Sequence, residues 1–190
     1  MSLLKKYEKG EYKYASYNKL RSWIITLIMY ALSAAIYTIG YTTTGSNKNL
    51  LTIVAILGVL PASKSLIGAI MSSRVRILDE TIHSRIEDSI ASLSGLYNLY
   101  LTSYDINFYI AHCVITKDSL LAYTTDKDFD NKRFDEHIKK HMKIEGIQDI
   151  LIKVFDNEDA YINRLTQLAK SDQSVQTNEK LINLLKNISV

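Results

Sequence analysis

The stretch Trp23–Thr43, WIITLIMYALSAAIYTIGYTT, is 21 residues long and carries no charged side chain. At ~1.5 Å rise per residue, a helix of this length is about 31 Å long, which matches the ~30 Å hydrocarbon core of a bilayer. A second uncharged run, Asn49–Ser63, follows after only the short segment Thr44–Lys48. The two runs therefore predict a transmembrane helical hairpin over residues 23–72.

Charge is distributed unequally on the two sides of this hairpin. Residues 1–22 form a basic arm with a net charge of +4, whereas residues 73–190 carry 15 basic and 18 acidic side chains. Because positive segments stay on the cytoplasmic side of a membrane, both termini are predicted in the cytoplasm of a cell-membrane protein, with the loop outside. A single cysteine, Cys113, suits a cytosolic domain, and the acidic balance does not favour nucleic acid as a partner.

Three hairpin residues are candidates for contacts with the membrane interface or with a partner. Trp23 lies where an aromatic belt forms, and Pro61 lacks the amide hydrogen of a regular helix and favours a kink. Lys64 lies in the cytoplasmic third of the second run, where its ammonium can reach the headgroups or pair with an acid inside the membrane. Of these two alternatives, we expect Lys64 to reach the headgroups.

Small residues recur four positions apart in both runs, as Ala31 and Ala35 in the first and as Gly58 and Ala62 in the second. Such pairs let helix backbones approach each other closely. Because the connecting loop is short, we expect these residues to pack within the hairpin. Self-association through Gly58 and Ala62 is the alternative.

The run Leu57–Leu66, LGVLPASKSL, resembles the second-span signature of a group of small, uncharacterised bacterial two-span membrane proteins. The resemblance extends into the C-terminal part of the chain. It implies the localisation and topology described above, and it implies no activity.

Residues 73–170 show the pattern of a mixed α/β domain, and residues 171–190 that of a polar linker followed by a short amphipathic helix. Apolar spacing predicts helices at about 76–92 and 130–144, a third after Asp156, and a last one at Glu179–Ile188. The first of these directly continues from the membrane, and the last can fold back on the domain or dock on a partner or membrane. Four strands are predicted: Leu96–Thr102, Phe108–Thr116, Leu120–Thr124 and Ile150–Phe155. The predicted fold is therefore α+β, a transmembrane hairpin followed by a cytosolic α-β-β-β-α-β-α domain.

The second predicted strand is apolar on both faces, which is typical of a central strand. Strict alternation places its apolar side chains in two sets, with Phe108, Ile110 and Val114 on one face and Tyr109, Ala111 and Ile115 on the other.

The order α-β-β-β-α-β-α resembles the core of the restriction-endonuclease-like fold. In that family an acidic residue near the second strand and a D/E-x-K element on the third hold a divalent metal ion. Asp105 stands near the start of the second predicted strand, but the third, Leu120–Thr124, offers neither an acid nor a lysine. The literal match, Asp130-Asn131-Lys132, falls at the next helix. The resemblance therefore implies the fold without its catalytic motif.

Other chemical candidates are weaker. His137 and His141 have the i, i+4 spacing that can present two imidazoles to one metal ion, and His112 and Cys113 could add ligands. We expect instead that these histidines are core or edge residues and that Cys113 is packed and inert. One face of the helix at 130–144 is basic and could meet phosphates, although interleaved acids favour a solvated, salt-bridged face: Lys132, Arg133, Lys139, Lys140 and Lys143.

The sequence thus predicts a membrane-anchored cytosolic binding or scaffolding domain without catalytic, cofactor-binding or metal-binding residues. Its expected partners are the lipid bilayer and a second protein, in the membrane or in the cytosol. Two alternatives stay open: a membrane-tethered, metal-dependent nuclease-like enzyme that uses Asp105, and a small transporter or channel subunit.

Overall fold

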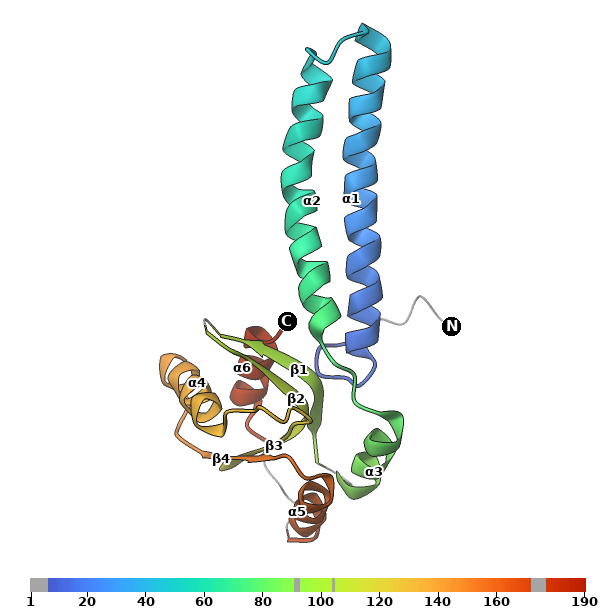
Figure 1. Ribbon diagram of the computed structural model, residues 1–190. Helices are drawn as coiled ribbons and strands as arrows, with labels where there is room; N and C mark the ends of the chain where they lie inside the picture. Colours follow the sequence, from blue (N-terminus) through green and yellow to red (C-terminus); the bar gives the residue numbers. More distant parts are fainter. Residues whose placement is uncertain (1–6, 91–92, 104, 172–176) are drawn as a thin grey trace. The chain divides into compact units, whose positions relative to one another are not determined.

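The computed structural model describes residues 7–90, 93–103, 105–171 and 177–190 (Figure 1). The predicted mixed α+β class, with two long apolar helices at the N-terminus and a four-stranded sheet, is confirmed. The elements are α1 Tyr14–Thr44, α2 Leu50–Arg74, α3 Glu80–Ile90, β1 Gly95–Thr102, β2 Asn107–Ile115, β3 Ser119–Tyr123, α4 Asn131–Ile144, β4 Leu151–Phe155, α5 Glu158–Ser171 and α6 Glu179–Ile188.

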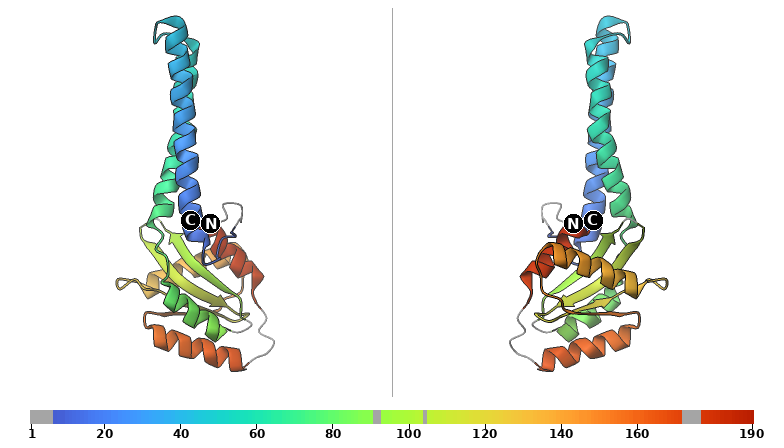
Figure 2. Two further views of the ribbon diagram at one scale, coloured as in Figure 1. Left: turned by 90° about the vertical axis from the view of Figure 1, so that its right-hand side faces the viewer. Right: turned by 90° about the vertical axis from the view of Figure 1, so that its left-hand side faces the viewer.

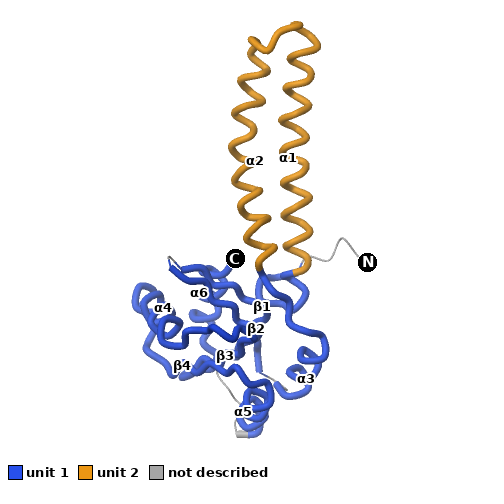
Figure 3. The backbone as a smooth tube through the Cα atoms, viewed as in Figure 1, with its two compact units in different colours: residues 1–15, 75–190 blue, residues 16–74 orange. Residues whose placement is uncertain are grey.

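The chain divides into two compact units, and the division does not follow the chain order (Figure 3). One unit is the pair of long helices, residues 16–74. The other combines residues 1–15 with residues 75–190. The predicted basic arm, residues 1–22, is therefore shared between the two units, and its first six residues lie outside the described part of the chain.

Helices α1 and α2 face each other along small side chains. On α1 the buried positions include Thr26, Ser33 and Gly40, which are seven residues apart and therefore share one side of the helix. The expectation that Ala31 and Ala35 pack within the hairpin is wrong, since both are exposed. At ~100° per residue they lie almost opposite Ser33. On α2, the buried small residues are Ala55, Ala62, Ala69 and Ser72.

Polar side chains also join the two long helices. Hydrogen bonds between them include Asn18 Nδ2 to Ser72 Oγ at 3.1 Å, Trp23 Nε1 to Ser73 Oγ at 2.8 Å, Thr26 Oγ1 with Ser65 Oγ at 2.9 Å, and Tyr30 Oη with Ser63 Oγ at 3.3 Å. These bonds satisfy groups that would otherwise be costly in an apolar environment.

The sheet of the second unit has the order β1-β2-β3-β4. Strands β1, β2 and β3 are antiparallel neighbours, whereas β4 runs parallel to β3, so the connection through α4 is a crossover. Helices α3 and α5 cover one face of the sheet and α4 and α6 cover the other (Figure 2). Each face therefore has its own hydrophobic core, and β1 and β4 are the edge strands.

The predicted helix at 76–92 is shorter in the structure and does not continue from the preceding helix. Residues 75–79 are not helical, and residues 91–92 lie outside the described part of the chain. Asp79 explains the new start, because its Oδ1 accepts a hydrogen bond from the Thr81 amide at 2.8 Å. An aspartate in this position caps a helix N-terminus. Helix α3 therefore begins at Glu80.

The alternation of side chains changes in the middle of β2. Phe108 packs on the α4 and α6 side and Tyr109 on the α3 and α5 side, as alternation predicts. Further along, Val114 lies with Tyr109 and Ile115 with Phe108, which is the reverse of the prediction. A one-residue shift of the pleat moves every later side chain to the other face. Strand β1 is irregular as well, at Asn98, where φ is 52°.

The C-terminal helix α6 folds onto its own domain, which decides between the alternatives left by the sequence. Leu181, Leu184 and Leu185 are buried in the same core as Phe134 of α4. The chain end also pairs with the sheet, since the Val190 amide donates to the Tyr100 carbonyl at 2.9 Å. Of the predicted linker 171–178, residues 172–176 lie outside the described part of the chain.

Candidate binding site at the outer edge of β1

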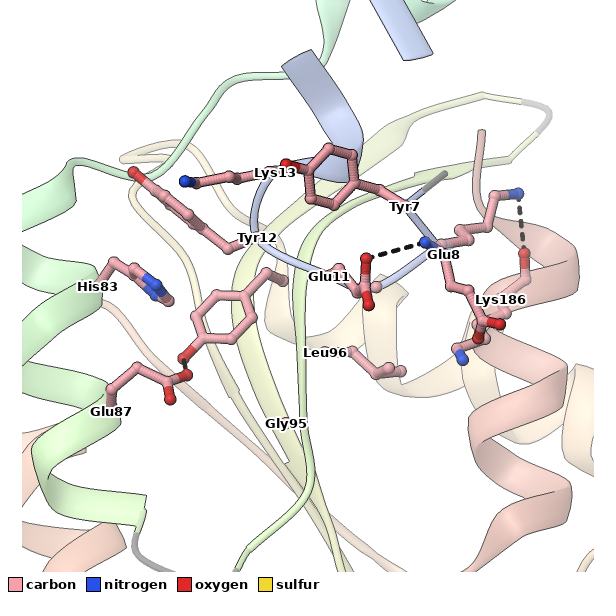
Figure 4. A pocket seen from close by; sticks show the side chains of 13 residues that line it. Tyr7, Glu8, Glu11, Tyr12, Lys13, His83, Glu87, Gly95, Leu96 and Lys186 are labelled. Atoms are coloured by element: carbon pink, nitrogen blue, oxygen red, sulfur yellow. Dashed lines mark hydrogen bonds between the residues drawn. The ribbon is translucent and has the colours of Figure 1, made fainter. Parts of the chain in front are cut away.

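Residues 7–13, here called the strap, lie along the outer edge of β1 (Figure 4). The Tyr97 amide donates to the Gly10 carbonyl at 2.7 Å, and Asn98 Nδ2 donates to the Tyr12 carbonyl at 3.0 Å. An uncovered edge strand presents unpaired backbone groups that can pair with other chains. The strap therefore satisfies part of an edge that would otherwise be open.

Lys9 anchors the strap at the end of α6. Its Nζ donates to the Lys186 carbonyl at 2.9 Å and to the Ser189 carbonyl at 2.6 Å. Carbonyls at a helix C-terminus lack partners within the helix, and a cation there is favourable. Burial lowers the pKa of Lys9 from its ordinary value.

A hollow of about 450 Å³ lies between the strap, α3, β1 and α6. Its floor includes Gly95 and Leu96 of β1. Tyr97 also lines the hollow and donates its hydroxyl to Glu87 of α3. The remaining lining mixes tyrosines with charges of both signs: Tyr7, Tyr12, Glu8, Glu11, Lys13 and Lys186.

A run of aromatic rings leads from the strap into the core. The Tyr12 ring stacks on His83 of α3 with ring centres 3.8 Å apart. Tyr97 lies edge-on to His83 at 4.8 Å and 4.3 Å from His112 of β2. The Tyr161 hydroxyl bonds to His112 Nδ1 at 2.7 Å. Stacked and edge-on ring pairs stabilise beyond their buried area, so this series ties the strap to both α3 and the sheet.

The imidazole of His112 packs against Gly95, one of the residues that line the hollow. Its side chain is fully buried, and its Nε2 has no hydrogen-bond partner among the residues that the structure describes. A Cβ atom at position 95 would lie 2.1 Å from Nε2, so only glycine leaves room for the imidazole. Burial, assisted by the nearby His83, lowers the pKa of His112 to about 3, and the ring is therefore neutral at physiological pH.

The structure does not bring the nuclease-like candidates together. Asp105 is exposed in the connection between β1 and β2. Asp130 caps α4, because its Oδ1 accepts from the Arg133 amide at 3.0 Å. Among the described residues, no group of three or more His, Cys, Asp or Glu side chains could hold a metal ion.

The zinc candidates lie on different elements. His137 and His141 are neighbours on α4, with ring centres 4.7 Å apart. Cys113 packs in the core beneath α4 and α6, whereas His112 contacts Tyr161 of α5 across the sheet. Burial raises the pKa of the Cys113 thiol to about 12, which fits the expectation of a packed, unreactive side chain.

The basic face of α4 is partly neutralised by its own acids. Arg133 pairs with Asp130 at 3.4 Å, and Lys139 pairs with Asp135 at 3.0 Å. These ion pairs agree with the interpretation of this helix face as a solvated, salt-bridged surface.

The three hairpin candidates lie on exposed surface. Trp23 is exposed and donates its indole N–H to Ser73, and Pro61 and Lys64 are exposed on α2. Their contacts with a membrane interface or a partner stay predictions.

Sequence reasoning missed the strap and Asn98. Strap residues Gly10 and Tyr12 belong to a Tyr- and Lys-rich segment whose lysines predict only the orientation of the chain in the membrane. The tyrosines of this segment could have indicated a packing role for the strap. A topology signal needs lysine or arginine but no aromatic rings, so it does not account for the tyrosines.

Comparison with known proteins adds no assignment: the chain matches no protein-family model, and no curated protein or solved structure gives a significant match. The resemblances to two-span membrane proteins and to the restriction-endonuclease-like core therefore stay predictions.

Proposed function

We propose that this protein is a membrane-anchored, non-catalytic binding domain of the cell membrane, with both termini in the cytoplasm. Its partner is a segment of another protein, bound in the hollow at the outer edge of β1. The hollow and its strap are the single observation that carries this proposal.

The surface of the two long helices supports the membrane anchor. Both helices are long and apolar enough to cross a bilayer. Their large side chains point outward, as in Leu27 and Leu50, which are 72% and 74% exposed. A helix in the core of a soluble protein would bury such residues, whereas a bilayer replaces water around them.

The strap supports a topology with both ends on one side of the membrane. Residues 9–12 form hydrogen bonds with β1, α6 and Leu78, so the segment before α1 and the domain after α2 fold as one unit. One folded unit occupies one compartment. The excess of lysine and arginine in residues 1–22 favours the cytoplasm.

The chemistry of the hollow supports binding rather than catalysis. Tyrosine is enriched where proteins bind each other. Charges of both signs at the rim of the hollow can complement opposite charges on a polypeptide partner. Burial moves the pKa values of the titratable groups near the hollow away from physiological pH. It lowers the pKa of His112 and raises the pKa values of Tyr97 and Tyr161. A general acid or base works best with a pKa near the operating pH.

Cysteine labelling tests the topology. A membrane-impermeant maleimide added to intact cells should modify Ser46→Cys in the loop between α1 and α2, since that loop is predicted outside. Asn163→Cys, on the exposed side of α5, should react only after the cells are permeabilised. Labelling of Asn163→Cys in intact cells would contradict the proposed orientation.

Photo-crosslinking tests the binding site. Benzoylphenylalanine placed at Glu8 or Lys186, in the lining of the hollow, should yield the same protein adduct in native membranes. Placed at Asn163 or Lys170 on α5, it should yield none. Adducts of equal yield at all four positions would count against the hollow.

A cleavage assay tests the nuclease-like alternative. Cleavage of DNA or RNA with Mg²⁺ that is lost in Asp105→Ala would favour that alternative.

A further inference from the structure

Asn98 is a buried residue in the left-handed region, with φ at 52°, within a paired strand. Asparagine tolerates this conformation better than most residues, but it still requires support from its surroundings. Its side chain supplies that support: Oδ1 accepts from the Leu78 amide at 2.9 Å and from the Tyr109 hydroxyl at 3.1 Å, and Nδ2 donates to the Tyr12 carbonyl at 3.0 Å.

Two of these partners flank the pair of long helices in the chain. Tyr12 precedes the start of α1 at Tyr14, and Leu78 follows the end of α2 at Arg74. The Tyr12 hydroxyl also donates to the Leu78 carbonyl at 2.8 Å. The segment that enters the hairpin and the segment that leaves it therefore meet at one side chain of β1.

We infer that Asn98 is a latch through which the spacing of the hairpin helices controls access to the hollow. This inference rests on the proposed function and describes the regulation of its binding site. If the two hairpin ends move apart, Tyr12 and Leu78 can no longer both stay bonded to Asn98. The part of the strap at Gly10 and Tyr12 then leaves β1, the bond from the Tyr97 amide to Gly10 opens, and the hollow widens onto the outer edge of β1, where an extended segment of the partner can pair.

A substitution in the hairpin itself can change that spacing. Ser72 is buried near the end of α2, where its Oγ accepts a hydrogen bond from Asn18 of α1. Ser72→Leu should force the two helices apart at this end. Ala55 is equally buried on α2, 17 residues or about 26 Å along the helix towards the loop. Ala55→Leu is therefore a matched control that widens the far end.

Hydrogen exchange of the Tyr97 amide, measured on the full chain in nanodiscs, reports whether the strap is bonded to β1, because this amide donates to the Gly10 carbonyl. Ser72→Leu should raise the exchange rate of this amide about tenfold, a coupling typical of linked sites. Ala55→Leu should leave the rate unchanged. Asn98→Gly keeps a residue that adopts positive φ and removes the side chain, so exchange should already be fast and Ser72→Leu should add nothing.

Two results would overturn the latch: an unchanged Tyr97 amide in Ser72→Leu, or an equal increase with and without the Asn98 side chain. The amide of Ile138, a residue on the buried face of α4, reports whether a variant stays folded. If Ser72→Leu unfolds the domain, the smaller Ser72→Val provides the same measurement. Because exchange needs no partner, failure of the latch is distinguishable from failure of the binding site, which the crosslinks report.

Discussion

Replacing Gly95 by alanine is expected to lower the free energy of unfolding of the domain by about 3 kcal/mol, the upper range for overpacking a core. The new Cβ would lie 2.1 Å from Nε2 of His112. The imidazole cannot move aside easily, because it is fully buried, bonded to Tyr161 and packed against Tyr97. Guanidinium unfolding of the full chain in nanodiscs, followed by the near-ultraviolet circular dichroism of the tyrosines, measures the change.

Two variants make this result specific. Ser94→Ala changes an exposed neighbour and should alter stability by no more than ~0.5 kcal/mol. In the double variant Gly95→Ala, His112→Ala, the methyl group finds the space that the imidazole leaves. The loss should then be smaller than the sum of the two single losses. Additive losses would show that the clash with His112 is not the cause.

Acidification is expected to destabilise the domain through the same histidine. Burial holds the pKa of His112 at about 3 in the folded chain, against 6.5 as its ordinary value. Below pH 6.5 the unfolded chain therefore binds a proton that the folded chain does not. The stabilisation is complete above pH 6.5 and decreases as the pH falls towards 3, at ~1.4 kcal/mol per pH unit from this group.

The variant His112→Gln isolates this contribution, because glutamine can still bond to Tyr161 but does not titrate. Unfolding free energies of both proteins should be measured at pH 6.5, 5.5 and 4.5. The acidic side chains titrate in both and cancel in the difference. The advantage of the unchanged protein over His112→Gln should shrink with each step, and a constant difference would exclude His112 as the source.

The positions of most helices and strands of this protein could be predicted from local sequence patterns. Long uncharged runs predicted α1 and α2, and the apolar spacing with Asp130 as a cap predicted α4. The boundary between α2 and α3 could not be predicted in this way. Val75 and Leu78 continue the helical spacing, but the Asp79 cap and the bond from the Leu78 amide to Asn98 hold this segment out of a helix.

By itself, the sequence determined the elements whose signals lie within a single segment: the two apolar helices, the α+β class and the apolar faces of α4 and α6. Only the tertiary structure decided which faces meet. It placed Thr26, Ser33 and Gly40 in the hairpin interface, and it placed the strap on β1. The strap joins residues that are more than 80 positions apart in the chain, as in the bond between Tyr12 and Asn98. Local periodicity carries no record of such pairs, because they form only when the folded domain brings distant backbone and side-chain groups together.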